Sequence, residues 1–269
     1  MARAKINGAE LNYELAGTGP AVALLHEGVC DLRMWDELAE VLAPEFRVLR
    51  YDMRGYGDST LPPGPFSQSG DLLALFDHVG IERAALIGVS YGGRVALDTA
   101  FVAPERVTCL VLAATGLRDH EWSAVVREFG DEEERLVESG DLAAATDLNV
   151  RLWVDGPNRG PDPVREAVRE RVRMMQQRAF EIQEPAYAET PPPGPEKPVN
   201  VRLDEIRAPA LVVVGDADVP DFPEIADRLE AELPDARKVV LADTAHTIPL
   251  ERPDEFRSLA LEFLREHAS

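Results

Sequence analysis

Gly88-Val89-Ser90-Tyr91-Gly92 joins an apolar run, Ala84 to Ile87, to a stretch of helical composition at residues 93–100. The pattern predicts a serine on a sharp strand-to-helix turn, where its hydroxyl is held away from the backbone and can attack a substrate. The two glycines leave room for the turn, because a side chain in either position would clash. The N–H of Tyr91, at the helix N-terminus, is then free to stabilise an oxyanion. The alternative is a structural turn without a chemical role.

The composition indicates an acidic globular protein. The 269 residues are 45% hydrophobic and 29% charged, enough for one large α/β domain with an insertion or for two small domains. The formal net charge of −21 argues against a nucleic-acid partner, since phosphate binding needs clustered Lys and Arg. Such a charge is typical of a solvated acidic surface and does not select a substrate.

Cysteine usage and apolar runs predict the cellular location. Cys30 and Cys109 do not suggest a disulfide framework, which makes a reducing compartment the default. The first residues lack the apolar core of a signal peptide, and no apolar run approaches the length of a membrane span. We therefore expect a cytoplasmic protein that acts on a small molecule away from membranes. No feature of the sequence indicates an oligomeric state.

Predicted strands and helices alternate along most of the chain. The apolar runs that predict the strands of this alternation begin at Ala21, Phe46, Ala84, Val107, Ala210 and Lys238. Two earlier segments flank Asn7-Gly8 and predict an antiparallel hairpin. The alternation implies an α/β fold with a mostly parallel sheet of about eight strands and helices on both faces.

The alternation breaks between about Leu117 and Asp204. This stretch holds a charged helical run, Val164 to Gln177, and ends in Thr190 to Pro195, which cannot be helix or central strand. It is too long for a plain loop. We expect a helical cap at residues 117–203 and a core formed by residues 1–116 and 204–269. The acidic run Asp131 to Glu134 is interpreted as a solvated helix face.

A serine nucleophile needs a base that a third group orients. Of the five histidines, His246 stands out because it follows the last strand and can fold over the sheet edge where Ser90 lies. Asp216 and Asp218 follow another buried strand, and either could hold the imidazole in the useful tautomer. Three features at three strand ends are more specific than any one of them.

Several stretches resemble the α/β-hydrolase family, in its capped single-domain form, across nearly the whole chain. The matching stretches are Leu24 to Gly28, Asp52 to Ser59, Gly88 to Gly92, Gly215 to Asp218, and Ala245-His246 with Leu250 to Pro253. The order serine, aspartate, histidine is the order of this family. The resemblance favours Asp218 as the triad acid and Asp216 as a turn-stabilising carboxylate. Ser90 argues against haloalkane dehalogenases and epoxide hydrolases, which carry aspartate at this turn.

The loop after His26 departs from the family pattern. Family members usually read His-Gly there, whereas this chain has Glu27, followed by Gly28 at the position of the second oxyanion donor. We expect Glu27 to point outward and be inert. The alternative is that its carboxylate approaches the site, where it would disfavour an anionic substrate or take part in proton transfer. His26 resembles the family's structural histidine, whose ring braces loops.

The residues predicted to lie near the substrate are Glu27, Val29, Trp122, Trp153 and Phe180, although the aromatic ones suit a cap core equally well. No phosphate-binding loop and no metal-ligand spacing is present, so neither a cofactor nor a metal is expected.

The resemblance implies a serine hydrolase that cleaves a small, fairly apolar carboxylic ester or lactone. The same triad also serves C–C bond hydrolysis, thioester cleavage and biosynthetic cyclisation or lactone chemistry, among which the fold cannot choose. A ligand-binding relative without catalysis is the alternative from another class.

Overall fold

The computed structural model describes residues 1–160, 165–189 and 201–269, with the backbone alone for residues 184–189. Its centre is an eight-stranded sheet in the order β1-β2-β4-β3-β5-β6-β7-β8. The strands are β1 Ala2–Ile6, β2 Ala9–Ala16, β3 Ala21–Leu25, β4 Arg47–Tyr51, β5 Ala84–Val89, β6 Val107–Ala113, β7 Ala210–Gly215 and β8 Ala236–Leu241. The pairs β1–β2 and β2–β4 are antiparallel and the other neighbours are parallel, as the alternation predicted.

The hairpin at the N-terminal edge forms where the sequence predicted it. Asn7 and Gly8 both have positive φ, 45° and 86°, which is the backbone that a two-residue turn between twisted strands requires. β1 and β2 then pair from Ala2 opposite Tyr13 to Ile6 opposite Ala9.

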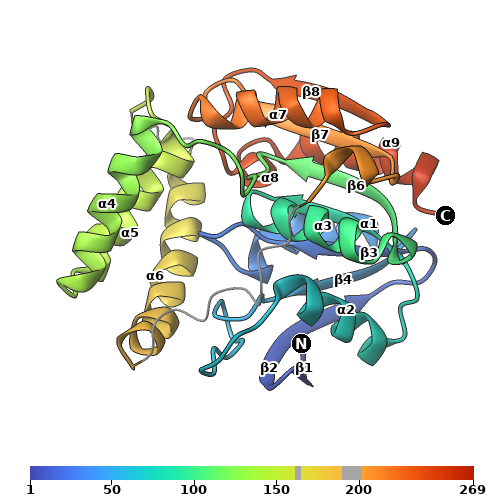
Figure 1. Cartoon of the computed structure of the whole chain (residues 1–269), viewed down its shortest axis with the longest axis horizontal. Helices are drawn as coiled ribbons and strands as arrows, with labels where there is room; N and C mark the ends of the chain where they lie inside the picture. The colour runs from blue at the N-terminus through green and yellow to red at the C-terminus, as the bar shows by residue number, and fades with distance from the viewer. Residues whose placement is uncertain (161–164, 190–200) are drawn as a thin grey trace.

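Helices cover both faces of the sheet (Figure 1). They are α1 Asp36–Leu42, α2 Gln68–Val79, α3 Tyr91–Val102, α4 Ala124–Glu138, α5 Leu142–Asn149, α6 Glu166–Glu189, α7 Asp221–Glu232, α8 Ile248–Glu251 and α9 Pro253–His267. Helices α2, α3 and α7 lie on one face, while α1 packs against α9 on the other. Within the described ranges, no helix combines the length and the apolar character that crossing a membrane requires.

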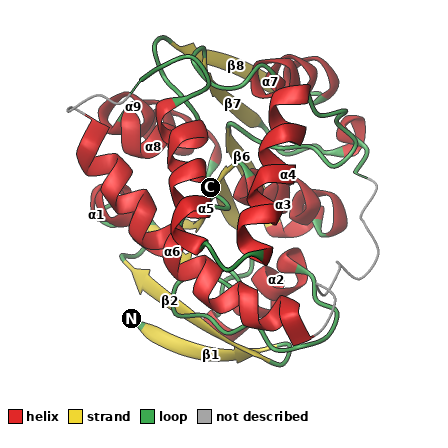
Figure 2. Ribbon diagram, turned by 90° about the vertical axis from the view of Figure 1, so that its left-hand side faces the viewer, coloured by secondary structure: helices red, strands yellow, loops and turns green. Residues whose placement is uncertain are grey.

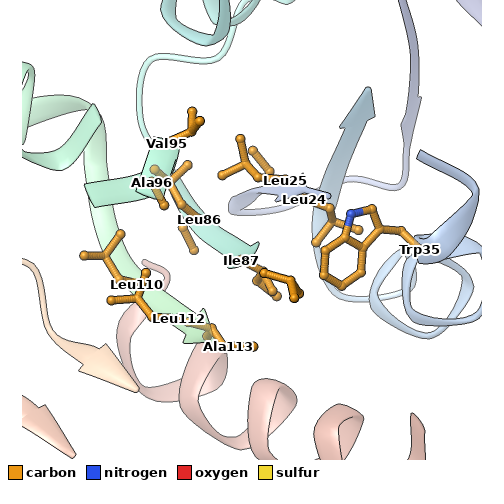
Figure 3. Packing of buried hydrophobic residues seen from close by; sticks show 14 of the residues in the cluster. Leu24, Leu25, Trp35, Leu86, Ile87, Val95, Ala96, Leu110, Leu112 and Ala113 are labelled. Carbon is orange, nitrogen blue, oxygen red and sulfur yellow. The ribbon is translucent and has the colours of Figure 1, made fainter. Parts of the chain in front are cut away.

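The core is centred on the middle strands. All six residues of β5 are buried, as expected of a parallel strand covered on both faces. Figure 3 shows Leu24 and Leu25 of β3 meeting Leu86 and Ile87 of β5, with the ring of Trp35 close to Leu24. This packed centre holds the carboxyl ends of the parallel strands in fixed positions at one edge of the sheet.

Helices α4, α5 and α6 form a separate layer beside that edge, which we call the cap helices (Figure 1). In the perpendicular view they lie in front of the strands (Figure 2). Helix α6 runs to Glu189, well beyond the predicted end at Gln177. The predicted proline-rich return, Thr190 to Pro195, lies outside the described residues, and the cap boundaries at 117 and 203 stay a prediction.

Candidate active site

Ser90 occupies the turn between β5 and α3 in a strained backbone conformation, with φ 52° and ψ −109°. A β-carbon added to Gly88 would lie 2.5 Å from the carbonyl carbon of Gly92, and one added to Gly92 would lie 2.1 Å from the carbonyl oxygen of Leu25. Both distances are far below any van der Waals contact, so the predicted need for two glycines is confirmed. Strain of this kind persists where the surroundings enforce it, and it exposes the hydroxyl of Ser90.

Asp218 and His246 form a buried pair across two loops. The Nδ1–H of His246 donates to Oδ2 of Asp218 over 2.8 Å, and the two side chains are 4% and 0% exposed. The other carboxylate oxygen of Asp218 accepts from the backbone N–H of Val219 at 2.8 Å, which fixes its orientation. Asp216, the alternative acid, accepts instead from the backbone N–H of Asp243 at 2.6 Å and stabilises the turn.

Two aromatic rings pack against the imidazole of His246 and against each other. Its ring centre lies 4.7 Å from that of Trp153 and 4.3 Å from that of Phe222. The backbone N–H of His246 also donates to the carbonyl of Trp153 at 3.3 Å. That carbonyl belongs to a π-helical turn, Val150–Asp155, a local distortion that is frequent at functional sites. The cap side of the molecule therefore contacts His246 directly.

Charges around His246 favour its protonated form. Burial would lower the pKa of His246, but the charge and hydrogen bond of Asp218 and the charge of Glu27 outweigh it and raise that pKa above its ordinary value. A base whose pKa lies near the working pH is suited to accept and return a proton in one turnover.

Ser90 and His246 line one cavity of about 250 Å³. Its floor consists of residues at the sheet edge: Glu27, Gly28, Val29, Tyr56, Ser90 and His246. Its roof consists of residues from the cap helices and the π-helical turn: Phe129, Glu133, Asn149, Trp153, Gln176, Phe180 and Gln183. In the described part of the chain no hydrogen bond joins Ser90 to His246, a contact that commonly tightens only when substrate binds.

The two predicted oxyanion donors lie side by side. A β-carbon built on Gly28 would be 3.9 Å from the Cβ of Tyr91, and Tyr91 is the first residue of α3. The N–H groups at a helix N-terminus can donate hydrogen bonds to an anion, and the helix dipole favours a negative charge there. The geometry thus suits a negatively charged oxygen beside Ser90.

Glu27 does not point outward, which corrects the sequence-based expectation. The residue is 0% exposed, and its Oε1 accepts a hydrogen bond from Sγ of Cys30 at 3.1 Å. Its other oxygen, Oε2, is buried and has no hydrogen-bond partner. Burial raises the pKa of Glu27, and the nearby charge of His246 opposes that rise. Glu27 is therefore a second buried carboxyl group in the electrostatic surroundings of His246.

Comparison with known proteins identifies the family. The model of the alpha/beta hydrolase family matches residues 22–259, most of the chain. The chain belongs to the α/β hydrolase family.

The relatives of this hydrolase are named for different activities. A Bacillus subtilis (strain 168) protein, provisionally named 2-succinyl-6-hydroxy-2,4-cyclohexadiene-1-carboxylate synthase, is 28% identical, and the match covers 94% of this chain and 95% of that protein. The structure of the enol-lactonase from Burkholderia xenovorans LB400 has a TM-score of 0.79 and 27% identity, covering 98% of this chain and 100% of that one. A thermophilic esterase from Thermogutta terrifontis has a TM-score of 0.78 and 28% identity, covering 99% of both chains.

His26 has the position and contacts of a brace in this hydrolase, as the family resemblance implied. Its Nε2 accepts from the backbone N–H of Met53 at 2.9 Å, and its Nδ1 donates to the carbonyl of Glu27 at 2.8 Å. Burial lowers the pKa of His26, so the neutral ring is favoured. The ring ties the loop after β3 to the loop after β4.

Four of the five predicted pocket residues line the cavity. Val29, Trp153 and Phe180 line the cavity together with Glu27. Trp122 lies outside it: its ring packs against His120 and Phe222, with centres 5.1 and 5.9 Å away. Trp122 therefore packs the cap onto α7 rather than contacting the cavity.

Several cavity residues escaped the sequence analysis. Glu133 belongs to the acidic run interpreted as a solvated face, yet it lines the roof and its carboxylate accepts a hydrogen bond from Asn149. A signal was present, because Glu133 occupies a position four residues after Phe129 and three before Leu136, on the apolar side of α4. Gln176 and Gln183 of α6 gave no such signal. Among the described residues, no three His, Cys, Asp or Glu side chains cluster as metal ligands would.

Proposed function

We propose that this α/β hydrolase cleaves a small, fairly apolar carboxylic ester or lactone through an acyl-enzyme on Ser90. The observation that carries the proposal is the buried pair of His246 and Asp218 at 2.8 Å, whose histidine lines one cavity with a serine on a strained turn. A serine, a histidine base and an orienting acid are the parts of nucleophilic acyl transfer. The enol-lactonase and esterase among the similar structures support ester or lactone chemistry.

The first half of the reaction builds the acyl-enzyme. The Oγ of Ser90 attacks the acyl carbon while Nε2 of His246 takes its proton, and Asp218 stabilises the imidazolium through Nδ1–H. The N–H groups of Gly28 and Tyr91 hold the oxygen that becomes negative. The tetrahedral species collapses as His246 gives the proton to the departing alkoxide. In a lactone the alcohol stays attached to the acyl chain.

The second half releases the product. His246 removes a proton from water, the resulting hydroxide attacks the acyl carbon, and the same two N–H groups hold the oxyanion again. The Ser90–acyl bond breaks, Ser90 recovers its proton from His246, and a carboxylic acid leaves.

A second candidate reaction uses the same cavity without an acyl-enzyme. The Bacillus subtilis relative is named a synthase, which favours considering a cyclisation or elimination in which His246 acts as the base. C–C bond hydrolysis and thioester cleavage remain alternatives that use Ser90. Binding of a ligand without turnover is the alternative from a different class.

Steady-state kinetics on short esters, γ- and δ-lactones and thioesters test the proposal. We expect Ser90→Ala and His246→Ala each to lower kcat by several orders of magnitude on the best substrate. Ser258→Ala, an exposed serine on α9, is the matched control and should leave kcat unchanged. Full activity in Ser90→Ala with none in His246→Ala would support the reaction without an acyl-enzyme. An inert wild type that binds a ligand without changing it would support the binding role.

A further inference from the structure

Both the floor and the roof of the cavity carry a carboxyl group. Glu27 on the floor is fully buried, and its Oε2 has no hydrogen-bond partner. Glu133 on the roof is half-buried and accepts a hydrogen bond from Asn149. Asn149 accepts in turn from Nε1 of Trp153 at 3.1 Å, so the Glu133 carboxylate belongs to a connected network above His246.

No fixed positive charge offsets these carboxyl groups. Among the described residues that line the cavity there is no lysine or arginine. The remaining polar lining consists of the amides of Asn149, Gln176 and Gln183 and the hydroxyl groups of Ser90 and Tyr56. His246 is the one lining residue in the described chain that can become positive, and Asp218 already holds its Nδ1–H.

A carboxylate on the substrate would meet no lysine or arginine among the described lining residues. When Glu27 and Glu133 are ionised, they repel it across a region of low dielectric constant, where unit charges interact strongly. When they are protonated, they offer hydrogen bonds but no charge, and the substrate carboxylate still loses its hydration. A neutral acyl group avoids both costs, and a cationic group is attracted by either ionised carboxylate.

We propose that Glu27 and Glu133 make this cavity select substrates whose acyl portion is neutral or positively charged and reject those that carry a carboxylate. The inference rests on the proposed ester or lactone hydrolysis and specifies its substrate class. This substrate preference would differ from that of the Bacillus subtilis relative, whose name includes a carboxylate.

The charge of the whole molecule is a competing cause that the experiment must separate. A net charge of −21 repels any anion over long distances. That repulsion is screened at 0.5 M salt, where the Debye length is only about 4 Å. Repulsion inside a cavity that excludes ions is screened far less. Discrimination that persists at high salt and depends on the two cavity glutamates is therefore local.

The test compares three 4-nitrophenyl esters of similar size. The cationic ester is the 4-(trimethylammonio)butanoate, its neutral isostere is the 5,5-dimethylhexanoate, and the anionic ester is the hydrogen adipate. Each kcat/KM is measured at 0.5 M salt, with an enzyme-free blank, and divided by the rate constant for hydroxide attack on the same ester. The enzymes are wild type, Glu27→Gln, Glu133→Gln and the matched control Glu134→Gln, an exposed glutamate on the same helix.

We expect wild type to use the cationic and neutral esters at least about tenfold better than the anionic one. Each cavity variant should lower the ratio of kcat/KM for the cationic or neutral ester to kcat/KM for the anionic ester at least about threefold. Glu134→Gln should leave this ratio unchanged. Glu133 is half-buried on a cap helix, so Glu133→Gln tests the claim even where Glu27→Gln fails to fold. Equal use of the anionic and neutral esters by wild type would overturn the inference, as would a ratio that no cavity variant changes. If Ser90→Ala hydrolysed the neutral ester as fast as wild type does, the proposed function would be contradicted instead.

Discussion

The floor and the roof of the cavity are built by different means. The floor is made of strand ends and the first turn of α3, whose backbones approach so closely that a β-carbon on Gly92 would lie 2.1 Å from the carbonyl oxygen of Leu25. The roof is made of helices, and Gly130 of α4 has no atom within 4 Å of the place where a β-carbon would stand. The floor therefore fixes the reacting groups by backbone packing, whereas the roof is formed by side chains that helices and the π-helical turn carry.

The largest difference is expected between the two aspartates that follow β7, below the floor's His246. Asp218→Asn should lower kcat by about 10³- to 10⁴-fold, because the amide favours the wrong tautomer of His246. Asp216→Asn, two residues away, should change kcat less than about threefold, since the Asp216 carboxylate accepts from the N–H of Asp243 in the turn rather than from His246. Steady-state kinetics on the best ester measure both. A larger loss in Asp216→Asn than in Asp218→Asn would show that the acid has been assigned wrongly.

The same substitution should have opposite effects on stability in the two regions. Gly92→Ala should destabilise the fold by about 3 kcal/mol or more, because the new methyl group overlaps the carbonyl oxygen of Leu25. Gly130→Ala should stabilise it by about 0.5–1 kcal/mol, because alanine loses less conformational entropy inside a helix. Urea unfolding midpoints measure both changes. Equal effects of one sign would contradict the contrast between floor and roof.

A substitution in the roof should alter the preference for acyl-chain length more than it alters kcat. Phe129 lines the cavity with its ring centre 5.1 Å from that of Trp153. Phe129→Ala should raise kcat/KM for an octanoate ester relative to a butyrate ester by about three- to tenfold, with kcat on butyrate nearly unchanged. Val125→Ala, an exposed position one turn earlier on α4, is the control and should leave the chain-length preference as it is. A fall in kcat equal to that of Asp218→Asn would show that Phe129 contributes to the chemical step.

The smallest effect is a shift in the pH profile. Hydrolysis needs neutral His246, so kcat/KM falls as the pH drops through its pKa, which Asp218 and Glu27 raise. Glu27→Gln removes a negative charge that favours the imidazolium, so the acid limb should move to lower pH by about half a unit. Glu134→Gln should leave the limb in place. If the acid limb of Glu27→Gln does not shift, or shifts to higher pH, the charge of Glu27 does not act on His246.

The contrast between floor and roof also explains what the sequence could reveal. The turn at Ser90 was predictable because only glycine fits where two backbones meet. The mostly parallel sheet of about eight strands and the hairpin at Asn7-Gly8 were predictable because strand pattern and turn chemistry are local signals. A contact of His246 with Asp216 or Asp218 was predictable because the carboxyl ends of parallel strands share one edge of the sheet, and the family resemblance favoured Asp218.

The misjudged residues depend on how loops and helices pack in three dimensions. Glu27 was expected to point outward, but it is fully buried and accepts a hydrogen bond from Cys30 within the same loop. Glu133 lies in a charged run whose composition suits solvent, although its spacing from Phe129 and Leu136 places it on the side of α4 that faces the floor. Trp122 packs against Phe222 of α7, a contact between segments that local patterns do not join.

The proposed chemistry depends on a serine in the floor that His246 activates. Intact-protein mass and peptide mapping after treatment with a fluorophosphonate probe measure that activation. We expect one adduct, on Ser90, that is absent in Ser90→Ala, formed far more slowly in His246→Ala and unchanged in Ser258→Ala. A folded wild type that gains no adduct, or gains one at another residue, would contradict it.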